Sequence, residues 1–555
     1  METPTAPDSP DREERELASE IAVREAEAFE QGEEGGGPSP GRIARSTAFF
    51  SAATAASRIA GLGREVVAAS YYGVYGPMSA FTIAFQVPNL VRSLFADAAL
   101  QPAFVPIFTE QLERKNYREA FRLASTLLLL VTLVLGVITA LFVLLAPAIM
   151  PLFAPGFEGE LLDLTVTLSQ VLFPILILLG VSGVVVGILN SYDRFGAFAI
   201  SPLFWNLTII VVTVLLAPSF HGQNRIYAYA IGILVGTLVQ LLIPVWDLRN
   251  TPFKFEWSFE WRNRDVRRVL LLMLPVTISL GLINFNLLIN SFFGSLVSDE
   301  APAAIDKAFR IYQLPQGIFS VAIATVLFPT LARFANAGEM DNLRATMANG
   351  MRQILFVLVP AAAAVLVLSV PMIRLVYQRG EFNPEQTTLV ATALFWFAFS
   401  LPTNGLYLLQ TRTFFSLQRP WMATGLAGLD LVVSALGALV LYKPFGTGGI
   451  VAGTGIGTTA AVVAQAIVLR REFDGLELRR LFATAAKITI AAAALAAVSY
   501  GVWAVLDSTL GRGLLGQIVS LGAGLGLGGL VYLALAKLMR IAELEQIMRL
   551  LRRRR

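Results

Sequence analysis

The chain of 555 residues contains no cysteine and only one histidine, His221. The lack of cysteine excludes disulfides, thiolate metal sites, iron–sulfur clusters and cysteine nucleophiles. His221 lies in the short polar stretch SFHGQN, which is typical of a loop and offers no Ser–His–Asp set. The chain also lacks the phosphate-binding P-loop pattern GxxxxGK followed by Ser or Thr. We therefore predict no catalytic residue, no metal site and no bound cofactor.

Charge is also scarce in this sequence. Charged residues make up 15% of the chain and hydrophobic residues 55%, with a mean hydropathy of +0.65. Soluble domains carry about 25% charged residues, so this chain has too few polar side chains to cover a water-facing surface. The composition predicts a protein that is solvated mainly by lipid, and it gives no indication of nucleic-acid binding.

The N-terminal region differs from the rest of the chain. Residues 1–45 contain twelve acidic and five basic side chains and include the run QGEEGGGPSPG. Such a segment buries too little apolar area to offset its ordering entropy, so we expect a disordered acidic tail. The start is acidic and no apolar core follows a basic flank, which predicts that there is no signal peptide.

After the tail, long apolar runs alternate with short polar breaks. A membrane-spanning helix needs about 20 apolar residues, and fourteen runs meet this requirement. The sequence therefore predicts an all-α polytopic membrane protein with about 14 transmembrane helices. The expected spans are 46–70, 78–108, 121–150, 165–190, 198–217, 227–246, 268–296, 306–332, 351–376, 387–409, 420–441, 448–469, 482–506 and 514–537.

Two segments repeat in the sequence and predict its organisation. FQVPNL at 85–90 resembles YQLPQG at 312–317, and LFAPGFEGE at 152–160 resembles LVYQRGEFN at 375–383. The offsets are about 220 residues and enclose six spans, so we expect two parallel repeats with a site between them, as in many transporters. The predicted parts are the tail (1–45), an N-terminal six-helix lobe (46–250), a C-terminal six-helix lobe (251–470), two additional helices (471–540) and a basic C-terminal tail (541–555).

Charged side chains inside the spans are the candidate functional residues. Ionisable groups at bilayer depth are costly, and their usual explanation is a function. Ion pairs, such as Arg64 with Glu65 or Lys307 with Asp306, and side chains that reach the helix ends are the alternative explanations. Arginine stays charged and its planar fork suits phosphate, so an unpaired cluster predicts a phosphate or diphosphate substrate. The basic members are Arg58, Arg64, Arg92, Arg310 and Lys307, and the acidic ones are Glu65, Asp97 and Asp306.

Small and amide residues add weaker signals. Gly449, Gly453 and Gly457 are spaced by four, as are Gly522 and Gly526, and this spacing predicts close helix packing. A group of asparagines, Asn284, Asn286 and Asn290, lies on one apolar span. This group either lines a cavity or joins helices.

Several segments resemble the MurJ (MviN) lipid II flippases, a family of the multidrug/oligosaccharidyl-lipid/polysaccharide exporter superfamily. SRIAGLGRE at 57–65 and AFTIAFQVPNLVRSLFADAALQPAFVPIF at 80–108 are the most specific. FRIYQLPQGIFSVAIATVLFPTL at 309–331 and the segments LFAPGF and LVYQRGEF also match. The resemblance extends from about residue 46 to 540. One position departs from the family, which usually has Asp where this chain has Ser79.

The resemblance implies a function and a set of site residues. Members of the family flip the undecaprenyl-diphosphate-linked peptidoglycan precursor, lipid II, across the bacterial inner membrane by alternating access. The family's cavity arginines match Arg58, Arg64, Arg92 and Arg310, and its acids match Glu65 and Asp97. Its last two helices form an apolar groove for the polyprenyl tail, which matches 482–537. A gating ion pair built on the family's Asp is not expected in this chain, because Ser79 carries no charge.

Alternative functions follow from the same observations. An exporter of another polyprenyl-diphosphate-linked saccharide would need a similar cationic cavity. A multidrug exporter of the superfamily is expected to have an acidic cavity, and a polytopic enzyme would need an Asp, Glu or His constellation at the membrane surface. A scaffold that recruits cell-wall synthesis or division proteins is a further alternative. The membrane potential or a coupled monovalent ion would drive transport.

Reporter fusions can test the predicted topology. Lys and Arg collect in alternate loops: 109–122, 191–197, 247–267, 333–352, 410–419 and 470–480 hold 19, and seven more follow from Lys537. Positive loops remain cytoplasmic, so fusions at residues 1 and 555 should report the cytoplasm, and fusions at 158 and 300 the periplasm. A periplasmic signal at either terminus would contradict the prediction of fourteen spans.

Overall fold

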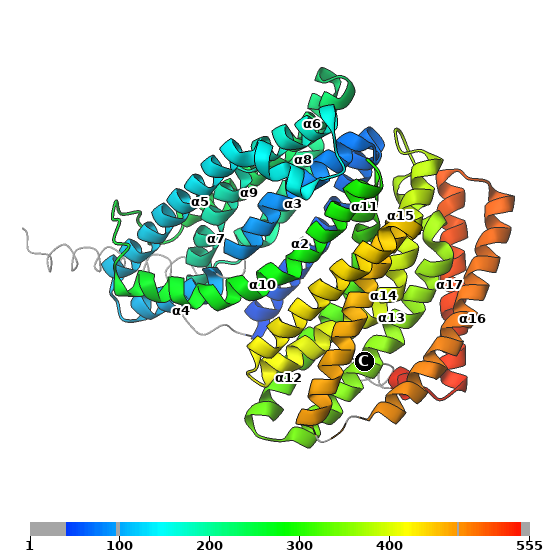
Figure 1. Cartoon of the computed structure of the whole chain (residues 1–555). Helices are drawn as coiled ribbons and strands as arrows, with labels where there is room; N and C mark the ends of the chain where they lie inside the picture. Colours follow the sequence, from blue (N-terminus) through cyan, green and yellow to red (C-terminus); the bar gives the residue numbers. More distant parts are fainter. Residues whose placement is uncertain (1–39, 96–99, 474, 476, 546–555) are drawn as a thin grey trace, which may run out of the picture. The chain divides into compact units, whose positions relative to one another are not determined.

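The computed structural model describes residues 40–95, 100–473, 475 and 477–545. At 40–48, 51, 92–95, 100–102, 274–284 and 478 it describes the backbone but not the side chains. The predicted acidic tail and most of the predicted basic tail lie outside these residues. Within them every regular element is a helix (Figure 1). The predicted all-α class is therefore confirmed.

Sixteen α-helices occur in the described part of the chain. Short 3-10 turns (Ala217–Ser219 and Gly222–Arg225) and a π-helical turn (η3, Gln316–Ser320) accompany them. The α-helices are α2 (Pro40–Tyr72), α3 (Gly76–Phe95), α4 (Leu100–Glu113), α5 (Tyr117–Phe153), α6 (Gly159–Leu172), α7 (Ile175–Ser191), α8 (Gly196–Leu216), α9 (Ile226–Leu248), α10 (Arg264–Val297), α11 (Ala301–Pro315), α12 (Val321–Asn336), α13 (Met340–Tyr377), α14 (Pro384–Ser416), α15 (Pro420–Glu472), α16 (Leu478–Leu510) and α17 (Leu514–Leu538).

Ten helical segments in the described residues are long and apolar enough to cross a membrane. One of them, α15, carries two of the predicted spans, 420–441 and 448–469, on either side of a sharp bend. Three other predicted spans correspond to α2, to α3 with α4, and to α10, which are not among the ten. The protein is a multi-pass membrane protein, and the total of fourteen spans remains a prediction.

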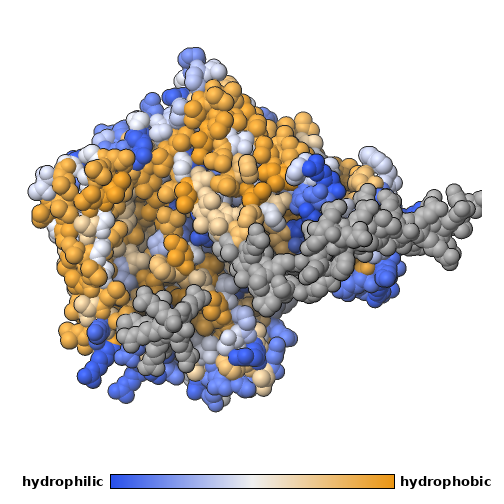
Figure 2. All heavy atoms as spheres, turned by 180° about the vertical axis from the view of Figure 1, so that it is seen from behind, coloured by the Kyte–Doolittle hydropathy of each residue, from blue (hydrophilic) through white to orange (hydrophobic). Residues whose placement is uncertain are grey.

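The outward surfaces of the helices are apolar, as lipid contact requires. Large side chains such as Leu144, Leu215 and Val440 are at least 70% exposed. Figure 2 shows apolar residues over most of the visible face, with hydrophilic residues gathered at its margins. In water such a surface would aggregate, whereas in a bilayer it contacts hydrocarbon.

A sharp bend inside α15 lets its two halves pack closely together. Gly446 has φ 55° and ψ −135°, a conformation that favours glycine. Beyond it, a Cβ atom at Gly453 would overlap the backbone of Ala438, and one at Gly457 would overlap Ser434. The packing predicted from the glycine row is confirmed here. The same prediction is wrong for Gly522 and Gly526, which face open space. The glycines that pack closely in this helix are Gly524 and Gly528, which contact Ser499 of α16.

The chain forms two compact units. Unit 1 comprises Met1–Val67, Ala84–Met150 and Asp163–Gly281, and unit 2 comprises Ala68–Ile83, Pro151–Leu162 and Leu282–Arg555. The core of unit 1 is rich in aromatic residues, with Phe104, Phe108 and Phe121 fully buried against α7 and the start of α10. The lobe boundaries predicted from the repeat remain predictions.

Within unit 2, hydrogen bonds donated by backbone N–H groups join several short turns. The Glu381 N–H donates to the Ser70 carbonyl at 2.9 Å. The Val74 N–H donates to the Gln386 side-chain oxygen at 3.2 Å, and the Gly156 N–H to the Ser295 hydroxyl at 3.2 Å. These bonds attach the α2–α3 corner to the α13–α14 turn, and the α5–α6 turn to α10.

The hairpin of α16 and α17 is attached to α13 near both ends of that helix. Arg352 Nε lies 2.9 Å from Glu543 Oε1, and Arg374 Nη1 lies 2.9 Å from Asp507 Oδ1. The two arginines are 22 positions apart, which is about 33 Å along a helix and close to the thickness of a bilayer core. Between them, the Tyr532 hydroxyl donates to the Phe356 carbonyl at 2.6 Å. The hairpin is therefore a bound part of unit 2.

Candidate functional site

The first candidate residues of unit 1 lie on α2, where Arg64 is held in place. Arg64 Nη2 forms an ion pair with Glu65 Oε1 at 2.6 Å, and both side chains are buried. The guanidinium also lies over the Trp205 ring of α8, 4.6 Å from its centroid. Close by, Asn206 donates to the Ser57 carbonyl of α2 at 3.4 Å, beside Gly61. The pairing of Arg64 with Glu65 is therefore observed.

Arg58 differs from Arg64 in its surroundings. Its side chain is exposed, and it makes no hydrogen bond or ion pair with any described residue. Six residues separate it from Arg64, or about 600° around a helix, so the two arginines occupy different faces of α2. Of these two arginines, Arg58 has the more exposed side chain.

The other two predicted residues of unit 1 cannot be placed in the same way. Arg92 lies on α3, but its side chain is outside the described part of the structure. Asp97 lies wholly outside the described residues. Their roles remain predictions.

The predicted residues of unit 2 lie on α11. Arg310 Nη2 contacts Asp306 Oδ1 at 3.3 Å, four residues away on the same helical face. The Arg310 side chain stays 39% exposed, so it can reach a further group. Lys307 is fully buried and lies 5.7 Å from the centroid of the Tyr377 ring. Asp306 thus pairs with Arg310 rather than with its neighbour Lys307, and the spacing of four was the signal for this pair.

A polar cluster in unit 2 was missed in the sequence, although its aspartate is the only acidic residue in the run 420–441. Asp430 of α15 is buried and accepts hydrogen bonds from Asn286 Nδ2 at 3.2 Å and from the Ser434 hydroxyl at 3.3 Å. The Thr458 hydroxyl also bonds to it. Asn286 Oδ1 is buried without a hydrogen-bond partner among the described residues. A carboxylate beside an unused amide oxygen and hydroxyls suits a proton or a hard monovalent cation.

The asparagines of α10 join helices. Asn286 reaches Asp430, and Asn290 Oδ1 accepts from the Thr454 hydroxyl at 2.8 Å. Both contacts cross from α10 to α15. The side chain of Asn284 lies outside the described residues.

An apolar cavity of about 650 Å³ lies between α14 and α15 in unit 2. Trp396 and Phe399 form one wall, and Ala452, Gly455 and Ile456 line the other. Such a surface can hold hydrocarbon. It differs from the groove for a polyprenyl tail that the family resemblance implies on the last two helices.

Ser79 has a clear structural role in unit 2. It is fully buried on α3, and its hydroxyl accepts a hydrogen bond from the Ala303 N–H at 3.1 Å. Ala303 lies in the first turn of α11, whose own N-cap residue, Glu300, provides no side-chain cap. Ser79 thus caps α11 from another helix, satisfying a donor that the helix cannot satisfy itself.

The electrostatics at the start of α11 are acidic. Burial raises the pKa of the Glu300 carboxyl, and the charges of Glu385 and Asp299 raise it further, against a hydrogen bond with Gln386. A carboxyl with a raised pKa takes up a proton more readily in the folded state. Protonation of Glu300 therefore favours the folded state, and this contribution to the free energy of unfolding is lost as the pH rises through the pKa of Glu300.

Comparisons with solved structures show which known folds this chain resembles. A structure of the lipid II flippase MurJ in an inward closed conformation covers 88% of this chain and 98% of its own, with a TM-score of 0.74 at 22% identity. An inward-facing multidrug resistance MATE family transporter of the MOP superfamily covers 75% of this chain and 94% of its own, with a TM-score of 0.65 at 15% identity. This chain therefore shares the fold of these two structures.

Comparisons of sequence identify the family. The profile of the family described as lipid II flippase MurJ matches residues 68–522. The chain is 33% identical over 472 residues to the probable lipid II flippase MurJ of Rhizobium meliloti. This match covers 82% of this chain and 86% of the relative. It is 27% identical to the lipid II flippase MurJ of Burkholderia cenocepacia, over 73% and 79% of the two chains. The chain belongs to the MurJ family, and the resemblance seen in its sequence is confirmed.

The cap at Ser79 gives a testable prediction. Ser79→Ala removes the acceptor for the Ala303 N–H and should lower the free energy of unfolding by about 1 kcal/mol. Ser79→Asp restores an acceptor at a helix N-terminus and should be more stable than the alanine variant. Thermal unfolding of the purified protein measures both. The control is Thr82→Ala, because Thr82 bonds only within its own helix. Equal melting temperatures for Ser79→Ala and wild type would show that the cap contributes nothing.

Proposed function

We propose that this chain flips lipid II across the cytoplasmic membrane by alternating access. The observation that carries the proposal is its membership of the MurJ family over residues 68–522. The protein is a multi-pass membrane transporter, and peptidoglycan biosynthesis is the process that a lipid II flippase serves. A multidrug exporter fits less well, because the predicted site is cationic. Complementation of bacterial cells depleted of their own lipid II flippase tests the proposal directly.

The finer features of this proposal extend the sequence predictions. Both termini lie in the cytoplasm of the bacterial cell, on the inner face of its membrane. Arg58, Arg64 and Arg92 of unit 1 and Arg310 of unit 2 bind the diphosphate, and Glu65 and Asp306 position two of them. Asp97 and Lys307 support the same site. Cell-wall synthesis or division proteins are the expected partners.

The contacts of each arginine determine how informative its substitution is. Removing Arg64 would break its buried ion pair with Glu65, and breaking a buried pair costs about 3–5 kcal/mol. Loss of transport in an Arg64 variant would then reflect folding as much as binding. Arg58 makes no such contact with the described residues, so its removal tests ligand binding more cleanly.

We expect Arg58→Ala to lower flipping at an unchanged level of folded protein. A charge-assisted hydrogen bond contributes about 1.5–3 kcal/mol, so the rate should fall by about 10-fold to 100-fold. Arg92→Ala should abolish flipping, and Arg92→Lys should recover it only in part, because lysine keeps the charge but loses the planar fork. The measurement is lipid II translocation per folded molecule in proteoliposomes.

The matched control for these variants is Arg114→Ala. Arg114 is 63% exposed and pairs with Glu110 one helical turn away, an arrangement that contributes little stability. Its removal should leave translocation unchanged. If both Arg58→Ala and Arg92→Ala translocate lipid II at the wild-type rate, neither residue belongs to the binding site. The proposal that the chain is a flippase would still stand.

We also propose that a monovalent cation or a proton, together with the membrane potential, drives transport through the cluster around Asp430. Asp430 and Ser434 of α15 and Asn286 of α10 would hold the ion. The unused Asn286 oxygen supports this assignment.

Asp430→Asn tests the coupling without emptying the cluster. Asparagine keeps an acceptor for Asn286 but loses the charge, so the variant should fold and lose the response of flipping to imposed sodium, proton or potential gradients. Thr454→Ala, which removes the neighbouring bond to Asn290, should keep that response. A variant that retains full gradient dependence would exclude Asp430 as the coupling residue. A wild-type protein indifferent to all three gradients would refute ion coupling and leave the flippase proposal standing.

A further inference from the structure

The segment between α9 and α10 has an unusual alternating sequence. Residues 253–262 read FKFEWSFEWR, in which an aromatic residue occupies every second position. The segment is irregular, with neither helix nor strand. Alternation of this kind separates two faces along an irregular or extended chain, and the structure shows what each face contacts.

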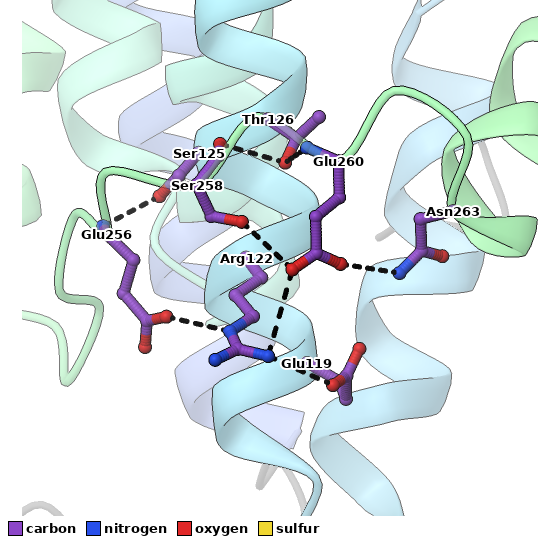
Figure 3. Close-up of polar contacts among 8 residues, drawn as sticks. All are labelled: Glu119, Arg122, Ser125, Thr126, Glu256, Ser258, Glu260 and Asn263. Carbon is purple, nitrogen blue, oxygen red and sulfur yellow. Dashed lines mark hydrogen bonds and ion pairs between the residues drawn. The ribbon is translucent and has the colours of Figure 1, made fainter.

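The central polar positions of the segment, Glu256, Ser258 and Glu260, face α5 (Figure 3). Arg122 of α5 lies between three carboxylates, with Nε 3.3 Å from Glu256 and Nη1 3.8 Å from Glu260 and 3.7 Å from Glu119. Because the segment meets α5 along more than one turn, its polar face is fixed to unit 1.

Backbone hydrogen bonds complete this attachment (Figure 3). The Glu256 N–H donates to the Ser125 hydroxyl at 3.0 Å. The Thr126 hydroxyl donates to the Ser258 carbonyl at 3.1 Å and accepts from the Glu260 N–H at 3.3 Å. The segment is therefore anchored through both its side chains and its backbone.

Phe253 packs against Phe121 in the core of unit 1, whereas the later aromatic positions of the segment point away from the protein. Four aromatic residues are exposed: Phe255 by 42%, Trp257 by 88%, Phe259 by 48% and Trp261 by 53%. Large aromatic side chains in an anchored segment would bury 150–250 Å² each if they had a partner. Such a row of exposed aromatic residues marks an interaction surface.

The position of this row relative to the lipid-facing surfaces indicates the partner. On α5, large exposed apolar residues begin at Leu133. Partly exposed apolar residues begin earlier, at Leu128, which is two residues, or about 3 Å, beyond Thr126, where the segment is attached. The polar layer of a bilayer is about 5–8 Å thick on each side, so the segment lies at the depth of the headgroups.

The neighbouring helices place the segment at the same depth. The exposed apolar surface of α9 ends at Trp246, which is 61% exposed and lies under the Arg249 guanidinium at 3.6 Å. Exposed leucines resume on α10 at Leu270. The aromatic row thus joins two surfaces that contact lipid.

We propose that residues 253–262 form a membrane-interface anchor, in which Phe255, Trp257, Phe259 and Trp261 insert among the phospholipid headgroups and the adjoining acyl chains. Tryptophan and tyrosine favour this layer because their rings are apolar with a polar edge. The acids of the segment pair with Arg122, and the exposed Lys254 and Arg262 lie near its two ends, so cations flank the aromatic row and suit anionic lipid. Arg262 also lies 4.6 Å from the Trp261 ring centroid, which places charge and aromatic surface together.

The lack of cysteine makes the anchor directly measurable, because any introduced cysteine is the only one in the chain. Single variants Phe255→Cys, Trp257→Cys, Phe259→Cys and Trp261→Cys would carry a nitroxide label in nanodiscs containing phosphatidylglycerol. Collisions with dissolved oxygen, compared with those of a water-soluble nickel chelate, report depth. We expect oxygen to dominate at all four positions, with nickel collisions several-fold lower than at the control Asp341→Cys, whose native side chain is 93% exposed.

Two outcomes would overturn the anchor. Labels at all four aromatic positions that collide with nickel as often as the Asp341 label would place the row in water, as expected of a docking surface for a soluble protein. Equal depth at Ser258→Cys and Trp257→Cys would show that the alternation does not separate two faces. Arg122→Gln removes the ion pairs that orient the segment, and in that background the depth difference between positions 258 and 257 should decrease. An unchanged difference would exclude Arg122 as the orienting residue.

Discussion

An ionised side chain in the centre of a bilayer costs about 2.5–3.5 kcal/mol even on the lower scales, and this constraint explains where the charges of this protein lie. Arg64 has Glu65 beside it and the Trp205 ring beneath it. Arg352 and Arg374 pair with acids near opposite ends of α13, about one bilayer core apart. A helix packing that failed to bring these partners together would leave charges exposed to hydrocarbon.

The same constraint divides the arginines by their carboxylate contacts. Arg64 and Arg352 have buried carboxylate partners and stabilise the positions of α2 and α13. Arg58 makes no ion pair with the described residues, and Arg310 has an exposed side chain beside Asp306. In a diphosphate site, the acids beside Arg64 and Arg310 would position these cations, and the exposed Arg58 would add charge. The pairing pattern therefore bears on function more directly than the number of arginines does.

Packing between helices depends on backbone approach rather than on apolar burial, because lipid is as apolar as leucine. Gly453 and Gly457 allow the two halves of α15 to touch, and that contact brings Thr458 to Asp430, which Ser434 contacts from one turn along the same half. The glycine seam thus builds the polar cluster. The same requirement for close approach explains why Gly524, rather than Gly522, faces Ser499 in the last hairpin.

The sequence alone determined the membrane class, the helical fold, the family and the main candidate arginines. It could do so because a long apolar run in lipid must be a helix that satisfies its own backbone, and because the local motifs around Arg58, Arg92 and Arg310 are specific. Only the tertiary structure decided that Arg352 pairs with Glu543, that Ser79 caps a helix from another element, and that Asn286 reaches Asp430. These contacts join residues more than a hundred positions apart or on separate helices, and hydropathy and spacing along one helix carry no information about which helices meet.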